Sequence, residues 1–174
     1  MRKLHLYYGT GKGKTTAAMG LAVRALGHGQ RVLIAQFLKS GTSGELEAFR
    51  RLEGALVYPS VQVKGFLFQM TPEERAATCA EQTQMARELA AYILREQPQT
   101  IILDELAVAW QLGIVEEQAA IALVEAALSC GETITTGRDA PAWLHHHADY
   151  VSRIDAEKHP YNTEGLMARE GVEW

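Results

Sequence analysis

The fold of this chain is decided by the stretch Tyr8-Gly9-Thr10-Gly11-Lys12-Gly13-Lys14-Thr15-Thr16. The residues before it, 4–8, are short, apolar and aromatic and stop at a glycine, which predicts a strand. The residues after it, 15–26, carry alanine and leucine at helical spacing and end at Gly27, which predicts a helix. The stretch is therefore a glycine-rich turn that joins a strand to a helix.

Such a turn has the chemistry of an anion site. Alternating glycines let successive backbone N–H groups point inward, and the start of the helix adds partial positive charge. Lys14 adds a full charge, and Thr15 is placed to offer its hydroxyl to Mg²⁺. Lys12 either adds a second charge or points into solvent. The stretch predicts a loop that binds nucleotide phosphates, although the usual pattern has glycine where this chain has Tyr8.

Strands and helices alternate along the rest of the chain. We expect further strands over 32–37, 55–63 with a break at Pro59, 100–103, 133–136 and 150–154, the last as a central strand. We expect helices over 45–52, 71–96, 116–129 and 140–148. This order predicts one α/β domain over residues 1–174, a mostly parallel sheet with helices on both faces, similar to the RecA-like P-loop NTPases. Ligands of such sheets bind at the carboxyl ends of the strands.

Composition excludes several classes of protein. The 174 residues include 17 Lys and Arg against 21 Asp and Glu, a net charge of −4, which argues against nucleic acid as the main partner. No apolar run approaches the roughly 20 residues that span a bilayer, so we expect no membrane partner. Two cysteines are too few for a disulfide framework. We therefore expect a cytoplasmic protein.

A second candidate site is the acidic end of the strand predicted over 100–103. Asp104 and Glu105 follow this apolar run directly. In P-loop folds a strand-end Asp holds Mg²⁺ beside the phosphate loop, and a neighbouring Glu can bind metal or act as a base. We therefore expect Thr15, Asp104 and Glu105 to form a metal site.

From Leu4 to Glu173 the chain resembles the P-loop-type ATP:corrinoid adenosyltransferases. Residues 9–18 are similar to the family sequence G-N-G-K-G-K-T-T-A-A, with Thr10 in place of Asn. The other matching segments are Arg24, Gly27-His28-Gly29, Gln36-Phe37-Leu38-Lys39, Leu103-Asp104-Glu105-Leu106, Thr136-Gly137-Arg138-Asp139-Ala140-Pro141 and Lys158-His159-Pro160-Tyr161.

The resemblance implies an enzyme that transfers the 5′-deoxyadenosyl group of ATP to the Co(I) of a reduced corrinoid and releases tripolyphosphate. It implies a homodimer, Mg²⁺ and an electron donor such as a reduced flavoprotein. Lys14, Asp104 and Glu105 would be catalytic. Arg24 would contact the phosphates, or else be a solvated helix charge. Arg138 would reach phosphate or corrinoid amides, or else form a surface ion pair.

The resemblance also assigns a role to Gly65-Phe66-Leu67-Phe68, which is similar to the family's G-F-x-W segment. It implies that Phe66 and Phe68 lie under the corrin ring and exclude the lower ligand of cobalt. Phe68 stands where the family usually has Trp, and the alternative is that both rings are core residues. Two other functions stay open: a nucleotide-dependent switch or chaperone that binds a corrinoid, and a plain P-loop ATPase or kinase.

Overall fold

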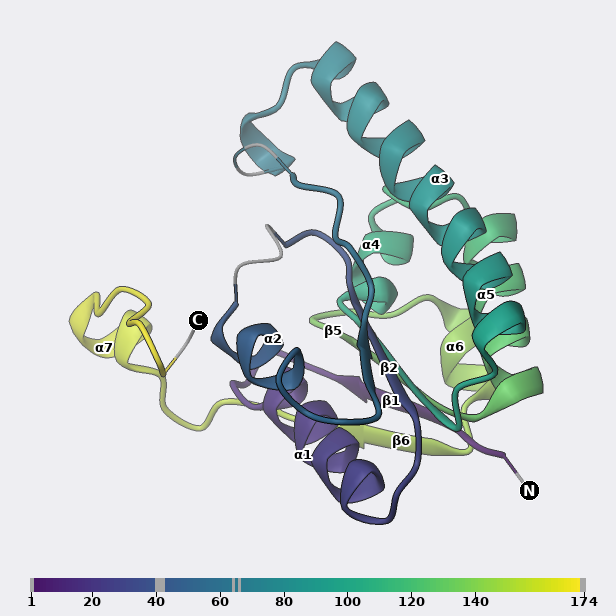
Figure 1. Ribbon diagram of the computed structural model, residues 1–174. Coiled ribbons are helices and arrows are strands. Elements are labelled where there is room, and N and C mark those ends of the chain that lie inside the picture. Colours follow the sequence, from purple (N-terminus) through teal and green to yellow (C-terminus); the bar gives the residue numbers. More distant parts are fainter. Residues whose placement is uncertain (1, 40–42, 64, 66, 173–174) are drawn as a thin grey trace.

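The computed structural model describes residues 2–39, 43–63, 65 and 67–172, with Phe68 described by its backbone alone. Six parallel strands form one sheet in the order β3-β2-β4-β5-β1-β6 (Figure 1). The strands are β1 (Leu4–Tyr8), β2 (Val32–Gln36), β3 (Ala55–Val57), β4 (Thr100–Asp104), β5 (Glu132–Gly137) and β6 (Tyr150–Arg153). The fold class predicted from the sequence is confirmed.

Helices cover both faces of the sheet (Figure 1). The helices are α1 (Lys14–Gly27), α2 (Gly44–Phe49), α3 (Pro72–Glu96), α4 (Leu106–Gln111), α5 (Glu117–Cys130), α6 (Ala142–His147) and α7 (Pro160–Glu164), with a 3₁₀ turn η1 (Leu67–Gln69) before α3. Of these, α7 lies apart from the sheet (Figure 1). Among the described residues, none of these helices combines the length and the apolar character needed to cross a membrane.

The alternation of side chains along the strands builds two cores. In β2, Leu33 and Ala35 face the larger core, which α3, α4, α5 and α6 complete, while Val32 and Ile34 face the smaller core under α1 and α2. All five residues of β2 are buried. This explains its unbroken apolar run, because a central parallel strand is covered on both faces.

The longest helix, α3, begins where the sequence predicts. Thr71 is its N-cap, and the Thr71 hydroxyl and the Glu74 carboxylate each accept a backbone N–H of the other residue. This capping box satisfies two N–H groups that have no partner within the helix. The helix packs its buried face against α5 and closes the larger core.

Two strand predictions are wrong. The segment expected over 55–63 forms a strand only at Ala55–Val57, since the chain leaves the sheet before Pro59, which has no N–H for a ladder. The strand expected to be central, β6, is the edge of the sheet, and all four of its residues are exposed. Its β-branched and aromatic residues predict a strand but not its position in the sheet.

The register brings five strand ends to one edge of the sheet. Tyr8 pairs with Gly137 on one side and with Arg153 on the other. On the other half of the sheet, Gln36 pairs with Asp104. The glycine-rich loop and the two acidic residues therefore leave the sheet at the same edge, as expected for a ligand site in a parallel sheet.

Candidate functional site

The glycine-rich loop, residues 9–13, is held between the ends of β5 and β6. The Gly9 N–H donates to the Arg138 carbonyl at 3.3 Å, and the Gly11 N–H donates to the Ile154 carbonyl at 2.8 Å. A Cβ atom on Gly9 would lie 2.4 Å from that Ile154 oxygen, and one on Gly11 would lie 2.7 Å from the Asp155 carbonyl carbon. Both positions need glycine because the backbone leaving β6 passes so close to them.

Lys14 begins α1 and folds back over the loop. Its ammonium donates to the Gly11 carbonyl at 2.7 Å, while Gly13, the N-cap before it, has a φ of 114° that favours glycine. Burial lowers the pKa of Lys14; the nearby Glu105 opposes this, and Arg138 adds to it. The ammonium is thus partly desolvated near the start of α1, where the first N–H groups have no partner within the helix, an arrangement suited to a phosphate.

Asp104, the last residue of β4, is fully buried and accepts four hydrogen bonds. Oδ1 accepts from the Thr15 hydroxyl at 2.8 Å and the Thr136 hydroxyl at 2.7 Å. Oδ2 accepts from Gln36 Nε2 at 3.1 Å and from the Lys39 ammonium at 2.7 Å. Thr15 and Asp104, two of the three residues expected at a metal site, are thus hydrogen-bonded to each other, and the other three donors were not predicted as site residues.

Glu105 turns the chain out of β4. Its φ is 60°, and its N–H donates to the Thr136 hydroxyl at 2.9 Å. Burial raises the pKa of the Glu105 carboxyl and Asp104 raises it further, while Lys39, Lys14 and Arg138 lower it. A cation that approached this carboxyl would favour its charged form.

The glycine-rich loop, Lys14 and Glu105 share one cavity of about 620 Å³ at the carboxyl edge of the sheet. Its polar walls come from the loop, from the end of β4 and from the segment after β5, and its apolar walls come from three other segments. The lining residues are Thr10, Gly11, Lys12, Lys14, Leu38, Val63, Gly65, Leu67, Glu105, Val108, Arg138 and His159. Six of the residues predicted for the site therefore meet in one cavity, whose charged side chains are mostly cationic.

His159 is a lining residue that the sequence analysis did not assign to the site. It is the N-cap of α7, and its Nδ1 accepts the Tyr161 N–H at 3.2 Å. A neutral imidazole with an accepting Nδ1 carries its proton on Nε2, so a donor is available on this ring. The signal was present in the segment Lys158-His159-Pro160-Tyr161 that the family resemblance includes.

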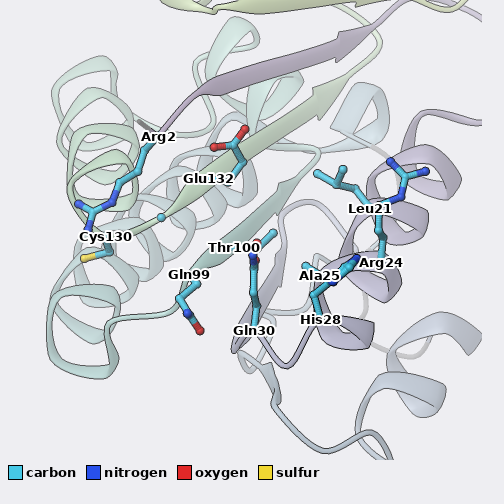
Figure 2. Close-up of a pocket in the computed structure, with 11 residues that line it drawn as sticks. Arg2, Leu21, Arg24, Ala25, His28, Gln30, Gln99, Thr100, Cys130 and Glu132 are labelled. Carbon is cyan, nitrogen blue, oxygen red and sulfur yellow. Dashed lines mark hydrogen bonds between the residues drawn. The ribbon is translucent and has the colours of Figure 1, made fainter.

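The structure does not bring Arg24 to the glycine-rich loop. Arg24 lies in the last turn of α1 and lines a separate cavity of about 420 Å³ together with Arg2, His28 and Glu132 (Figure 2). Thr100 and Glu132, which begin β4 and β5, line the same cavity, so it lies at the amino ends of the strands. Ten residues of α-helix separate Arg24 from Lys14, about 15 Å at 1.5 Å per residue. Within one chain, the predicted contact of Arg24 with the phosphates is therefore not supported.

The predicted aromatic pair falls largely outside the described residues. Phe66 is not described, and Phe68 is described only as part of the backbone of η1. Their neighbours Gly65 and Leu67 line the cavity of Lys14 and Arg138. The segment therefore borders the candidate site, and the position of the two rings stays a prediction.

The oxygen atoms near Thr15 fit a magnesium ion. Mg²⁺ prefers oxygen ligands and keeps part of its coordination for water and substrate phosphates. The Thr15 hydroxyl and the Asp104 carboxylate already lie within hydrogen-bond distance of each other. Within the part of the chain that the structure describes, no three His, Cys, Asp or Glu side chains converge on one point. A metal ion at Asp104 would therefore need ligands from a bound phosphate or from water.

Comparison with known proteins connects this site to one family. Residues 2–174 match the model of the family described as "ATP:corrinoid adenosyltransferase BtuR/CobO/CobP". A protein of Pseudomonas aeruginosa named corrinoid adenosyltransferase is 34% identical over 173 residues, which cover 98% of this chain and 83% of the relative. A Salmonella typhimurium protein named corrinoid adenosyltransferase CobA is 32% identical, over 97% of this chain and 84% of its own length. A Sinorhizobium relative of the same kind is 30% identical, over 95% and 77%.

Proposed function

The chain belongs to the ATP:corrinoid adenosyltransferase family, and from that premise we propose that it transfers the 5′-deoxyadenosyl group of ATP to the Co(I) of a reduced corrinoid. The electron pair of Co(I) attacks C5′ of the ribose, and the bond from C5′ to oxygen breaks. Tripolyphosphate leaves with the bonding electrons, and cobalt becomes Co(III) bonded to carbon. The observation that carries this proposal is the one cavity that gathers Lys14, Glu105 and Arg138 beside the glycine-rich loop.

Lys14 and the N–H groups of the first turn of α1 would stabilise the leaving group. Negative charge grows on the triphosphate as the bond to C5′ breaks, and cationic donors fixed beforehand stabilise that charge more than they stabilise bound ATP. Burial strengthens the effect, since Lys14 is already partly desolvated. The cation next to it in the cavity, Arg138, is placed for either the phosphates or the amides of the corrinoid.

Mg²⁺ bound to the triphosphate would neutralise part of the same charge, with Thr15 and Asp104 as its protein contacts. Glu105 follows Asp104 in the chain but lines the cavity of Lys14, whereas Thr15 lines a second cavity of about 360 Å³. We therefore assign Glu105 mainly to orienting the cationic groups and the ribose, and Asp104 to holding Thr15.

The apolar segments of the cavity would receive the corrinoid. Leu38, Val63, Leu67 and Val108 line it together with the charged groups. We retain Phe66 and Phe68 as the pair that packs under the corrin ring, because the segment containing them borders this cavity. Phenyl rings offer no lone pair to cobalt, so they would remove the lower ligand and ease reduction to Co(I).

The protein is proposed to act as a homodimer. A parallel strand is normally covered on both faces, yet β6 exposes Tyr150 and Val151, which are 54% and 45% exposed and point to opposite faces. A second copy that covered β6 would bury these side chains. Light scattering should give a dimer mass for the native chain and a lower mass for Val151→Glu, and a monomer for both would refute the assignment.

The proposed enzyme also needs an electron donor and a reducing compartment. Co(I) requires a strong reductant, so we propose a reduced flavoprotein as the electron donor. Cys79 and Cys130 are free thiols, which fits a reducing compartment such as the cytoplasm.

Phosphorus NMR separates this function from its alternatives. With ATP, Mg²⁺ and a chemically reduced corrinoid, the proposed reaction yields tripolyphosphate in an amount equal to the adenosylcorrinoid formed. A plain ATPase or kinase yields ADP instead, and a corrinoid-binding switch yields no adenosylcorrinoid. Either of those results would refute the proposal.

A further inference from the structure

The ammonium of Lys39 occupies the side of Asp104 that faces away from Thr15. Lys39 Nζ lies 2.7 Å from Asp104 Oδ2 and 3.9 Å from Glu45 Oε1. Leu38 before it has a φ of 58°, which residues other than glycine rarely adopt, and this turn brings Lys39 back to the edge of the sheet. The chain thus adopts an unfavourable backbone angle next to this ion pair.

Lys39 differs from the other three donors to Asp104 in charge and in exposure. Thr136 is fully buried and Gln36 is 1% exposed, so both are fixed by their surroundings. Thr15 is fixed by its place in the first turn of α1. The Lys39 side chain is 30% exposed, and together with Thr15, Thr16 and Glu45 it lines the cavity of about 360 Å³. It is the one charged group among the four donors, and it has open space beside it.

We propose that Lys39 is the resident cation of the Asp104 carboxylate, and that Lys39 and a divalent cation exclude each other there. The inference rests on the proposed function in so far as that function brings a metal nucleotide to Thr15 and Asp104. All four hydrogen-bonding positions of the carboxylate are taken, so a metal ion that binds it directly has to replace a donor. Lys39 is the donor that we expect to leave, because the metal ion repels its positive charge and the adjacent cavity gives it space to move.

The displaced ammonium gains a new partner in this scheme. It stays on the wall of the cavity that Thr15 and Thr16 also line, within reach of phosphates that the metal ion would bring to Thr15. Lys39 would thus neutralise Asp104 before the nucleotide binds and neutralise phosphate afterwards. Binding of the bare metal ion is disfavoured, and binding of the metal nucleotide is not.

Manganese binding without nucleotide or corrinoid tests this directly. Electron paramagnetic resonance counts free Mn²⁺ during a titration of the native protein, of Lys39→Met and of Lys39→Gln. We expect both variants to bind one Mn²⁺ at least about tenfold more tightly than the native chain. The melting temperature gives a second readout, because a metal that binds only the folded state raises it. Mn²⁺ should raise the melting temperature of the variants more than that of the native protein.

Lys14→Met is the matched control. It removes one positive charge from the same edge of the sheet, but Lys14 Nζ contacts the Gly11 carbonyl and not Asp104. If Lys14→Met and Lys39→Met gain the same affinity for Mn²⁺, the change in net charge alone explains the effect, and the proposal is overturned. Unchanged affinity in both Lys39 variants, or no binding by either, would also overturn it. The outcome does not depend on adenosyl transfer, so a failure of the proposed reaction would be seen separately.

Discussion

Thr136→Val replaces a hydroxyl with a methyl group of similar size. It should nevertheless lower the free energy of unfolding by more than the loss of a single hydrogen bond would. The Thr136 hydroxyl donates to Asp104 Oδ1 at 2.7 Å and accepts from the Glu105 N–H at 2.9 Å. Thr136 is fully buried, so water cannot replace either bond. The substitution removes a donor from a buried carboxylate and leaves the N–H of a residue with φ 60° without its partner.

The magnitude follows from these two bonds. A hydrogen bond to a charged group contributes about 1.5–3 kcal/mol, and leaving a buried N–H unpaired costs about 1–3 kcal/mol. Three other donors remain on Asp104, so we take the lower part of the combined range, about 3 kcal/mol. For a domain of 150–250 residues this corresponds to a fall in melting temperature of about 6–12 °C.

The neighbouring strand residue provides the control. Thr135 is equally buried, and its hydroxyl makes one neutral bond, to the His5 carbonyl at 3.1 Å, so Thr135→Val should cost only about 1 kcal/mol. Urea unfolding followed by circular dichroism measures both values. If Thr136→Val costs no more than Thr135→Val, Asp104 and Glu105 are not held in the way described here, and the reasoning about the site is wrong.

Three further predictions concern the site and the fold. Lys14→Ala should lower turnover at least a hundredfold in steady-state assays, equal to about 2.7 kcal/mol of lost transition-state stabilisation, while circular dichroism stays unchanged. Phe68→Ala should reduce activity strongly with cob(II)alamin, because its tethered base competes for the lower face of cobalt. The loss should be smaller with cobinamide, which has no such base. Chemical pre-reduction to Co(I) should restore most of the activity with both corrinoids. A hydrogen bond from Lys3, with help from the Leu4 N–H, lowers the pKa of Asp149 from its ordinary value of 3.8. A group whose pKa is lowered by folding stabilises the fold at pH values above its ordinary pKa. The difference in unfolding free energy between the native chain and Asp149→Asn, measured by urea unfolding, should therefore be full at neutral pH and shrink as the pH falls below about 4.

Each of these has an outcome that would contradict it. Near-native turnover of Lys14→Ala would mean that another group stabilises the leaving phosphate. An equal loss for both corrinoids in Phe68→Ala, with no recovery after pre-reduction, would make Phe68 a packing residue, and Phe68→Trp should stay active because the family resemblance places Trp there. If the difference in unfolding free energy between the native chain and Asp149→Asn does not change with pH, the charge of the Asp149 carboxylate does not stabilise the N-terminal strand.

The sequence predicts most of the fold because its signals are local. The glycine-rich loop and the start of the long helix at Thr71 are each set by residues within about one turn of each other. The position of β6 at the edge is not local, because any apolar strand can occupy the centre or the edge of a sheet. The six-residue helix α4 was missed because it follows Glu105, which has a left-handed backbone conformation, with no capping residue to mark its start.

The sequence predicts the residues of the candidate site that belong to motifs at strand ends, and it misses other residues that contact them. Thr15, Asp104 and Lys14 follow from a motif, and the parallel register alone brings them together. Lys39, which follows β2, and Thr136, in β5, reach Asp104 from other parts of the chain, and the spacing of the sequence does not reveal which polar residues will share a carboxylate. The expected contact of Arg24 with the phosphates comes from the family resemblance alone, and within one chain Arg24 lies in the last turn of α1 at a separate cavity.

The central claim is that the bond broken lies between C5′ and oxygen, and carbon-13 NMR with ATP labelled at C5′ tests it most directly. In a single turnover with a chemically reduced corrinoid, the account predicts that the label moves to a carbon bonded to cobalt, in an amount equal to the protein active sites. Label that appears in ADP while phosphate is released would contradict it, because the nucleotide would then have been cleaved at phosphorus.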